Sequence, residues 1–453
     1  MENIEHKKLS DSTLKDISDT YRASRWNNDI MYTQVKTFLG IEKIEDVVNL
    51  TEIVSTYTRR VVGVVFEDFL ADNGYTITRQ FSSDGTDNLY PYSYENIEIE
   101  YQVCKKIIND GAMLIVNKSN GFKLAFMCSY YSHDSSKFEF FIDKNSEYKA
   151  EIVLKELKEY ALKHNYLKNK KITPDFSFIK VDKGYTWDSV ILDAKTTKQV
   201  ASNINTILNN LEVYTKNSTS FKRGIIFKGV PGVGKTLIGK ILCNVADITV
   251  IWVTPKYLER SSNIARIGEL ARELAPTILF LEDIDLYGAK RESSSDKTLL
   301  GELMNQLDGI EENKNIIVIA TTNRSDELEN ALRNRPGRFD TVIEIPKPDK
   351  DCRKKMLELY SKDFNKESID FESIAINTDK YTGAHIKDLV NLAVMKAIDE
   401  GSLDEDKKII LKQVHYDSSI KTVGEKKIAI SDAFHMKEKS SRTPLDTYPD
   451  DDY

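Results

Sequence analysis

The sequence lacks the features of a secreted, disulfide-bonded or membrane-spanning protein. Its 453 residues include only four cysteines, none in a Cys-x-x-Cys pair, which disfavours a disulfide framework and a zinc site. No apolar run approaches the roughly 18 residues that cross a bilayer, and the first residues lack the order of a secretory signal. We therefore expect a cytoplasmic protein without a membrane span, whose cysteines are small buried or half-buried apolar residues in a reducing compartment.

Positive charge is not in excess either. The chain has 64 Lys and Arg against 71 Asp and Glu, a net charge of -7, so a large domain that coats nucleic acid is disfavoured. The hydrophobic share of 40% and the charged share of 30% are typical of folded soluble domains. At about 150 residues per domain, the length corresponds to roughly three domains.

Residues 1–183 are expected to form an α+β domain that binds a client or partner. The polar first 40 or so residues are interpreted as an arm or short helices, residues 41–70 as helical, and residues 73–98 as loop or irregular strand. Further elements follow, with Asn120-Gly121 as a hairpin turn: strands at 112–116, 122–128, 137–142 and 176–181, and a helix at 150–161. A tyrosine cluster has two open interpretations, a binding face or ordinary core and sheet-surface residues: Tyr90, Tyr92, Tyr94, Tyr101, Tyr130 and Tyr131.

After residue 184, short apolar runs alternate with helical patterns. The runs lie at 225–227, 250–253, 278–281, 316–320 and 342–345. Continuous apolar strands that alternate with helices predict a parallel sheet covered on both faces. We place this α/β domain at 184–347, a helical lid at 348–405, and a carboxy-terminal extension with an acidic tail at 406–453.

The glycine-rich segment Gly229–Thr236 matches the pattern G-x-x-x-x-G-K-[ST], between an expected strand and an expected helix. In such a loop, backbone N–H groups turn inward around phosphate oxygens, and the helix amino terminus adds partial positive charge. Lys235 would then reach the β- and γ-phosphates of ATP, and the Thr236 hydroxyl would bind Mg²⁺. The predicted nucleotide-binding residues here are Gly229, Val230, Pro231, Gly232, Val233, Gly234, Lys235, Thr236 and Leu237.

A second buried strand ends in acidic residues. The run 278–281 is followed by Glu282 and Asp283. We assign Glu282 to the metal side of the site and Asp283 to polarising the attacking water. An acidic loop that merely follows a strand is the alternative interpretation.

A third buried strand, at 316–320, leads to Asn323, which is a candidate for orienting the water near the γ-phosphate. About a dozen residues later, Arg335 and Arg338 flank a Pro-Gly turn. Two arginines across such a turn make a rigid fork that suits phosphate charge.

Taken in order and spacing, these motifs resemble those of the AAA clade of the AAA+ ATPases, over about residues 185–400. The resemblance implies a P-loop sheet domain with a helical lid, hydrolysis of ATP with Mg²⁺, and a ring that usually has six subunits. In such a ring, Arg335 and Arg338 act as arginine fingers on the neighbour's nucleotide. The family order is usually Asp then Glu. The reversed order here, with Lys222-Arg223-Gly224, resembles the branch of the mitochondrial Rieske-protein translocase and its bacterial relatives.

Two more assignments follow from the resemblance. Gly383 and Ala384 match the Gly-Ala step that the family places near the nucleotide, whereas His385 is expected to have no catalytic role. Tyr257 and Leu258 supply the aromatic–apolar pair of the family's substrate-threading loop, but no glycine follows them. A packed helix-capping turn is the alternative for that segment.

These features together predict an oligomeric, Mg²⁺-dependent ATPase that remodels, unfolds or chaperones protein substrates selected by residues 1–183. Two alternatives stay open. A nucleic-acid-directed AAA+ motor or loader is disfavoured by the net acidic charge. A nucleotide-dependent scaffold with little turnover is compatible with the short side chain of Asp283.

Overall fold

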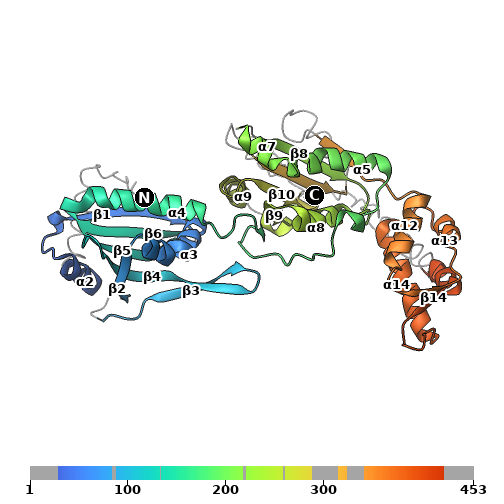
Figure 1. Cartoon of the computed structure of the whole chain (residues 1–453), viewed down its shortest axis with the longest axis horizontal. Coiled ribbons are helices and arrows are strands. Elements are labelled where there is room, and N and C mark those ends of the chain that lie inside the picture. The colour runs from blue at the N-terminus through green and yellow to red at the C-terminus, as the bar shows by residue number, and fades with distance from the viewer. Residues whose placement is uncertain are drawn as a thin grey trace, which may run out of the picture. The chain divides into compact units, whose positions relative to one another are not determined.

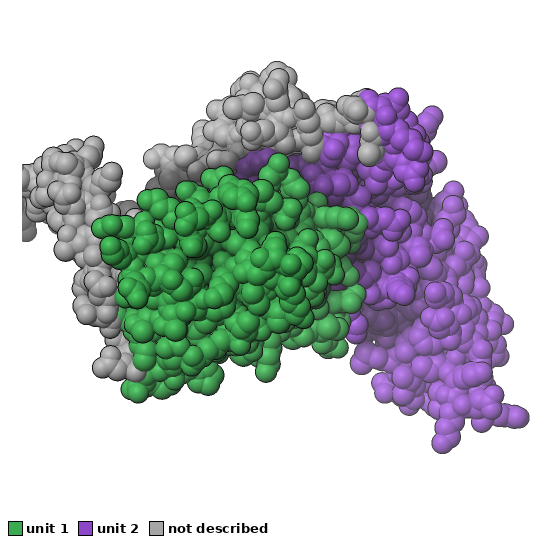
Figure 2. Space-filling model, turned by 60° about the vertical axis from the view of Figure 1, so that its left-hand side comes forward, with its two compact units in different colours: residues 1–170 green, residues 171–453 purple. Residues whose placement is uncertain are grey.

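The computed structural model describes residues 29–83, 88–132, 134–217, 221–258, 261–287, 315–323 and 341–422. The chain divides into two compact units, Met1–Lys170 and Lys171–Tyr453 (Figure 2). Within the described ranges, no helix is long and apolar enough to span a membrane. All four cysteines are free thiols, and Cys104 is exposed while the other three are buried.

The first unit is an antiparallel sheet with helices on both faces. Its strand order is β1-β6-β5-β4-β2, and β3 pairs with the first half of β4 (Figure 1). Alternate residues of β5 face opposite sides: Met127 joins the core under α2, whereas the ring of Phe126 packs against Phe66 of α3 with centroids 4.7 Å apart. The strands are β1 (Val47–Ser55), β2 (Tyr75–Phe81), β3 (Ser93–Glu100), β4 (Val103–Asn117), β5 (Lys123–Ser132) and β6 (Ser135–Asp143), and the helices are α2 (Ile30–Leu39), α3 (Thr56–Asp72) and α4 (Glu147–Lys163).

The region 41–70, expected to be helical throughout, contains a long strand. β1 pairs antiparallel with β6 along its whole length, and the chain enters α3 only at Thr56. The prediction was wrong because the apolar residues of this run fit both the helical and the strand period. Pairing with a distant strand, which sequence periodicity does not contain, decides between the two.

Other expectations for this unit have mixed outcomes. The expected hairpin is confirmed, because β4 pairs with β5 around the Asn120-Gly121 turn, and the third strand and the helix correspond to β6 and α4. Residues 73–98, expected as loop or irregular strand, hold β2 and most of β3, and both strands have register shifts in their pairing with β4. Segment 176–181 contributes only a single bridge, between Ile172 and Phe178, instead of a strand.

The second unit contains the expected parallel sheet, in the order β12-β8-β11-β10-β9-β7. Figure 1 labels β8, β9 and β10 of this sheet. The central strands β10 and β11 are buried at every residue, as strands covered on both faces are. On the face toward α8, Phe280 of β10 packs in one core with Ile238 and Leu242 of α8. The strands are β7 (Lys171–Ile172), β8 (Lys222–Lys228), β9 (Thr249–Val253), β10 (Thr277–Leu281), β11 (Ile316–Thr322) and β12 (Thr341–Glu344), and the helices are α5 (Ala194–Val200), α6 (Thr206–Leu208), α7 (Leu211–Lys216), α8 (Lys235–Val245) and α9 (Ser261–Glu273).

The short edge strand β7 places the start of the second unit earlier than the sequence suggested. Lys171 lies opposite Val250 of β9, and its ammonium donates to the carbonyls of Ala246 and Ile248 at 2.6 Å each. Residues 171–183, which we expected in the amino-terminal domain, therefore begin the unit that contains the parallel sheet.

The lid follows β12 and combines several helices, among them a helical run at 413–422, with a small parallel strand pair. The pair, β13 with β14, shows that the segment is not purely helical. Tyr416 is fully buried in the lid core, so this core extends beyond the expected boundary at residue 405. The elements are α12 (Lys350–Tyr360), β13 (Asn365–Glu367), α13 (Phe371–Asn377), α14 (Gly383–Asp399) and β14 (Ile410–Lys412).

Candidate active site

The glycine-rich segment links the end of β8 to the start of α8, as its pattern requires. Gly234 caps α8 with a φ of +110°, and Gly232 has a φ of +81°, conformations that side-chain-bearing residues rarely adopt. A Cβ at Gly232 would also lie 2.8 Å from Cβ of Ala384 in the lid. The loop therefore presents the amino terminus of α8, where an anion is favourably bound.

Lys235 is the first residue of α8, and its side chain is buried inside the loop. Its ammonium donates to the carbonyl oxygens of Gly229 at 2.6 Å and Val230 at 3.0 Å, and to Oδ1 of Asn323 at 2.8 Å. Burial lowers the pKa of Lys235, and the carboxylates of Asp283 and Asp285 oppose that shift. A cation is thus fixed at the centre of the loop.

Thr236 and Glu282 form the part of the site that fits a magnesium ion. The Thr236 hydroxyl donates to Oε1 of Glu282 at 2.9 Å, which brings two oxygen ligands together from α8 and from the end of β10. Magnesium in nucleotide sites is usually held by one or two protein oxygens together with phosphate oxygens and water. These side chains fit that donor set.

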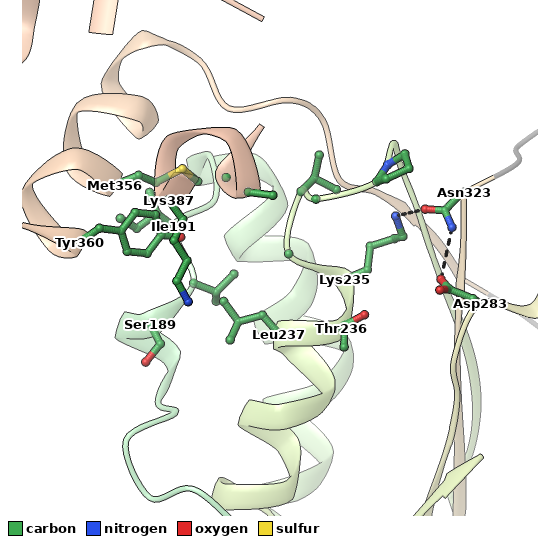
Figure 3. A pocket seen from close by; sticks show the side chains of 17 residues that line it. Ser189, Ile191, Lys235, Thr236, Leu237, Asp283, Asn323, Met356, Tyr360 and Lys387 are labelled. Atoms are coloured by element: carbon green, nitrogen blue, oxygen red, sulfur yellow. Dashed lines mark hydrogen bonds between the residues drawn. The ribbon is translucent and has the colours of Figure 1, made fainter. Parts of the chain in front are cut away.

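Asp283 is connected to Lys235 through Asn323. The amide of Asn323 donates to Oδ1 of Asp283 at 3.3 Å while its carbonyl oxygen accepts from Lys235, as the dashed lines in Figure 3 show. The backbone N–H of Asn323 donates to Oδ1 of Asp285 at 2.9 Å. Partial burial, with the neighbouring charges of Glu282 and Asp285, raises the pKa of Asp283.

A cavity of about 300 Å³ lies over the loop, and the lid forms one of its walls (Figure 3). The backbone N–H of Ala384 donates to the carbonyl oxygen of Gly232 at 3.0 Å, so the start of α14 is joined directly to the loop. The cavity is lined by Ser189, Val190, Ile191, Pro231, Gly232, Val233, Gly234, Lys235, Thr236, Leu237, Asp283, Asn323, Met356, Tyr360, Gly383, Ala384 and Lys387.

Comparison with known proteins agrees with this geometry. Residues 225–347 match the family described as "ATPase family associated with various cellular activities (AAA)". The chain carries an AAA ATPase domain. The finer placement in the branch of the mitochondrial Rieske-protein translocase stays a prediction.

Three curated relatives illustrate the likeness. The proteasome-activating nucleotidase of Methanopyrus kandleri is 38% identical over 202 residues, which are 42% of this chain and 46% of the relative. The chloroplastic/mitochondrial ATP-dependent zinc metalloprotease FTSH 11 of Arabidopsis thaliana is 33% identical over 244 residues, 52% of this chain and 29% of the relative. The 26S proteasome regulatory subunit 8 homolog of Schizosaccharomyces pombe is 35% identical over 247 residues, 51% of this chain and 61% of the relative. The chain thus spans between 29% and 61% of the length of these relatives.

The AAA domain brings most of the predicted site residues together. Gly229 and Val230 contribute carbonyl oxygens to Lys235, and Glu282 is reached through Thr236. The other predicted residues of the loop, the strand ends and the lid line the cavity itself. Arg335 and Arg338 lie outside the described residues.

Some residues that line the cavity were missed in the sequence analysis. They come from the segment between β7 and α5, at 189–191, and from the lid, at Met356, Tyr360 and Lys387. No motif marks them. The only available signal was the spacing of Met356 and Tyr360, which lie four residues apart and therefore on one face of α12.

Two assignments made from the resemblance can be compared with the structure. His385 accepts from the backbone N–H of Thr382 at 3.1 Å through Nδ1, so it caps α14 and does not line the cavity. Leu258 is buried, Tyr257 is half-buried, and the ammonium of Lys256 lies over the Tyr257 ring, 4.5 Å from its centroid. These contacts favour the packed turn over an exposed threading loop at this position.

Proposed function

We propose that this chain binds ATP with Mg²⁺, hydrolyses it in an oligomeric ring and uses the energy to remodel protein substrates. One observation carries the proposal. The pair Thr236–Glu282 and the chain Lys235–Asn323–Asp283 meet at the carboxyl ends of neighbouring parallel strands, beside one cavity. This arrangement places a cation, a magnesium ligand set and a candidate base around the position of a terminal phosphate.

Each residue has a distinct part in the proposed reaction. The loop N–H groups and Lys235 bind the β- and γ-phosphates, and Thr236 and Glu282 hold the metal ion. Mg²⁺ supplies positive charge that neutralises the phosphate oxygens. Asn323 orients a water molecule, and Asp283 accepts its proton as the water oxygen bonds to the γ-phosphorus and the bond to the ADP oxygen breaks.

The remaining walls of the cavity suit a nucleoside. Ile191, Met356 and Tyr360 are apolar or aromatic groups at the side of the cavity away from Asp283 (Figure 3). A planar base packs well against such side chains, while the phosphates lie over the loop. Because Met356 and Tyr360 belong to the lid, a bound nucleotide would contact both the sheet domain and the lid.

The proposals about partners rest on the relatives and on the resemblance. The relatives include an ATP-dependent metalloprotease and a proteasome-activating nucleotidase, which supports a protein substrate. We propose that the amino-terminal unit selects this substrate, and that Arg335 and Arg338 reach the nucleotide of the neighbouring subunit in a ring, which we propose is hexameric. A cytoplasmic location is part of the same proposal.

The test is Asp283→Asn, which keeps the size of the side chain and removes its basicity. We expect ATP binding to be retained, while phosphate release falls by about a hundredfold or more, because a positioned base contributes roughly 10²–10⁴ in rate. The control is Asp247→Asn, an exposed carboxylate outside the cavity. Wild-type turnover in the Asp283 variant would contradict the assignment.

A second measurement separates the classes of substrate. ATP hydrolysis by the full chain is followed with an unfolded protein, with DNA, or with neither added. Stimulation by unfolded protein supports the proposal, whereas stimulation by DNA alone supports the nucleic-acid-directed alternative. Negligible hydrolysis under all three conditions would favour a nucleotide-dependent scaffold.

A further inference from the structure

Glu282 has a second hydrogen-bond donor, from a strand that none of the motifs includes. The indole Nε1 of Trp252 donates to Oε2 of Glu282 at 3.1 Å. Oε1 of the same carboxylate accepts from Thr236 at 2.9 Å. The two oxygens are therefore held separately, one by α8 and one by β9.

The indole ring packs against a single phenylalanine ring, which in turn contacts α8. Trp252 is opposite Phe280 in the register of β9 and β10, and the two ring centroids lie 4.4 Å apart. Phe280 is fully buried, and its ring lies against Gly239 of α8, where an added Cβ would be only 2.5 Å from Cζ. The position of the indole N–H is thus tied to the helix that carries Thr236, which lies one turn before Gly239.

The chemistry of this contact suits a metal-side glutamate. Glu has one more rotatable bond than Asp, so fixing its carboxylate costs more conformational entropy. An indole N–H is an uncharged donor without acceptor capacity. It can hold the carboxylate without neutralising its charge and without competing for the cation. Hydrogen bonds to a ligating carboxylate of this kind typically change metal affinity by about 10–100-fold.

We propose that Trp252 is a positioning residue that pre-orients Glu282 to receive Mg²⁺ in the nucleotide complex. This inference rests on the proposed nucleotide function of the same site. Its consequence is specific, because Trp252 does not line the cavity. Trp252 should therefore affect the magnesium-dependent part of nucleotide binding and leave the metal-free part unchanged.

The test uses Trp252→Phe in the full chain, because Phe retains an aromatic ring against Phe280 and lacks the N–H. Binding of a fluorescent ATP analogue is measured at equilibrium, in EDTA and over a series of Mg²⁺ concentrations. We expect the Mg²⁺ concentration for half-maximal effect to rise about tenfold, with unchanged affinity in EDTA. An unchanged Mg²⁺ dependence, or an equal loss of affinity with and without the metal, would overturn the proposal.

Two further variants make the result specific. In a Glu282→Gln background, Trp252→Phe should cause no additional shift in Mg²⁺ dependence, since a double-mutant cycle isolates the pair. An equal shift in both backgrounds would mean a merely structural role. Trp187→Phe makes the same chemical change at another half-buried tryptophan of the same core, and should leave the Mg²⁺ dependence unaltered.

If Trp252→Phe does not fold, the proposal is tested in a chain whose only tryptophan is Trp252, made by Trp26→Phe and Trp187→Phe. Mg²⁺ added to the nucleotide-bound protein should change its emission, and Glu282→Gln should abolish that change. Tryptophan emission that does not change when Mg²⁺ is added would overturn the proposal. These measurements test the role of Trp252 through Mg²⁺ and nucleotide binding, so they do not require phosphate release. A wild-type chain that releases no phosphate would contradict the proposed ATP hydrolysis and leave the test of Trp252 valid.

Discussion

Replacing Gly239 by alanine should disturb the nucleotide site from one helical turn away. A Cβ at this position would lie 2.5 Å from Cζ of Phe280 and 2.7 and 2.8 Å from its two Cε atoms. Favourable carbon–carbon contacts lie at roughly 3.5–4.0 Å, so the ring or the helix must move by about 1 Å. The ring has little freedom, because Phe280 is fully buried and Trp252 packs against it.

The size of the effect follows from two opposing contributions. Overpacking of a buried site costs about 1–3 kcal/mol, and the rigid surroundings of Phe280 favour the upper part of that range. Alanine in place of glycine within a helix contributes about 1 kcal/mol in the opposite direction. We therefore expect Gly239→Ala to lower the free energy of unfolding by about 1–2 kcal/mol. A shift of α8 would also move Thr236 relative to Glu282 and weaken Mg²⁺–nucleotide binding.

The assays are urea unfolding followed by tryptophan fluorescence, and equilibrium binding of Mg²⁺–nucleotide. Gly63→Ala is the matched control, since it places the same residue within α3 of the other unit. There the nearest atoms would be Cβ and Cδ1 of Ile107, at 3.0 and 3.1 Å, and nucleotide binding should not change. A Gly239→Ala protein as stable as the wild type, with unaltered nucleotide binding, would refute the reasoning.

Two further predictions concern turnover. Arg335→Ala and Arg338→Ala should each preserve ATP binding and remove most phosphate release, because an arginine supplied by a neighbouring subunit can be worth roughly 10³–10⁵ in rate. Wild-type turnover in either variant would show that the replaced arginine is not an arginine finger. Thr321→Val removes a hydroxyl whose oxygen accepts the backbone N–H of Asp283 at 2.9 Å. We expect it to slow phosphate release while Mg²⁺–nucleotide binding stays unchanged, and a loss of binding in place of turnover would contradict that role.

The sequence was most informative where function depends on contiguous residues. The segment Gly229–Thr236 could be interpreted because its glycines, its lysine and the start of α8 are adjacent in the chain. The polar ends of β10 and β11 were also visible, since parallel strands bring their carboxyl ends to one edge of the sheet. In these two places, the local sequence pattern was enough to predict where the side chains lie in the fold.

Prediction was weaker where the fold unites distant segments without a motif. Met356 and Tyr360 join the cavity only because the lid folds over the loop, and their spacing indicates a shared face of α12 without indicating what that face contacts. The hydrogen bond from Trp252 is similar, because it depends on the register of β9 beside β10. For β1, the apolar residues fit two periods, and pairing with β6 decided the outcome.

The reversed order of the two acids is accommodated by the backbone and by their neighbours. Asp283 has a φ of +46°, a left-handed conformation that Asp tolerates better than most residues, and its N–H is held by the buried hydroxyl of Thr321. In this conformation its short side chain is within hydrogen-bond distance of Asn323. The longer Glu282 extends in the other direction, between Thr236 and Trp252. The two side chains differ in length, and each is held by its own hydrogen-bond partners. The Glu-Asp order is therefore compatible with one carboxylate on the metal side and one on the water side.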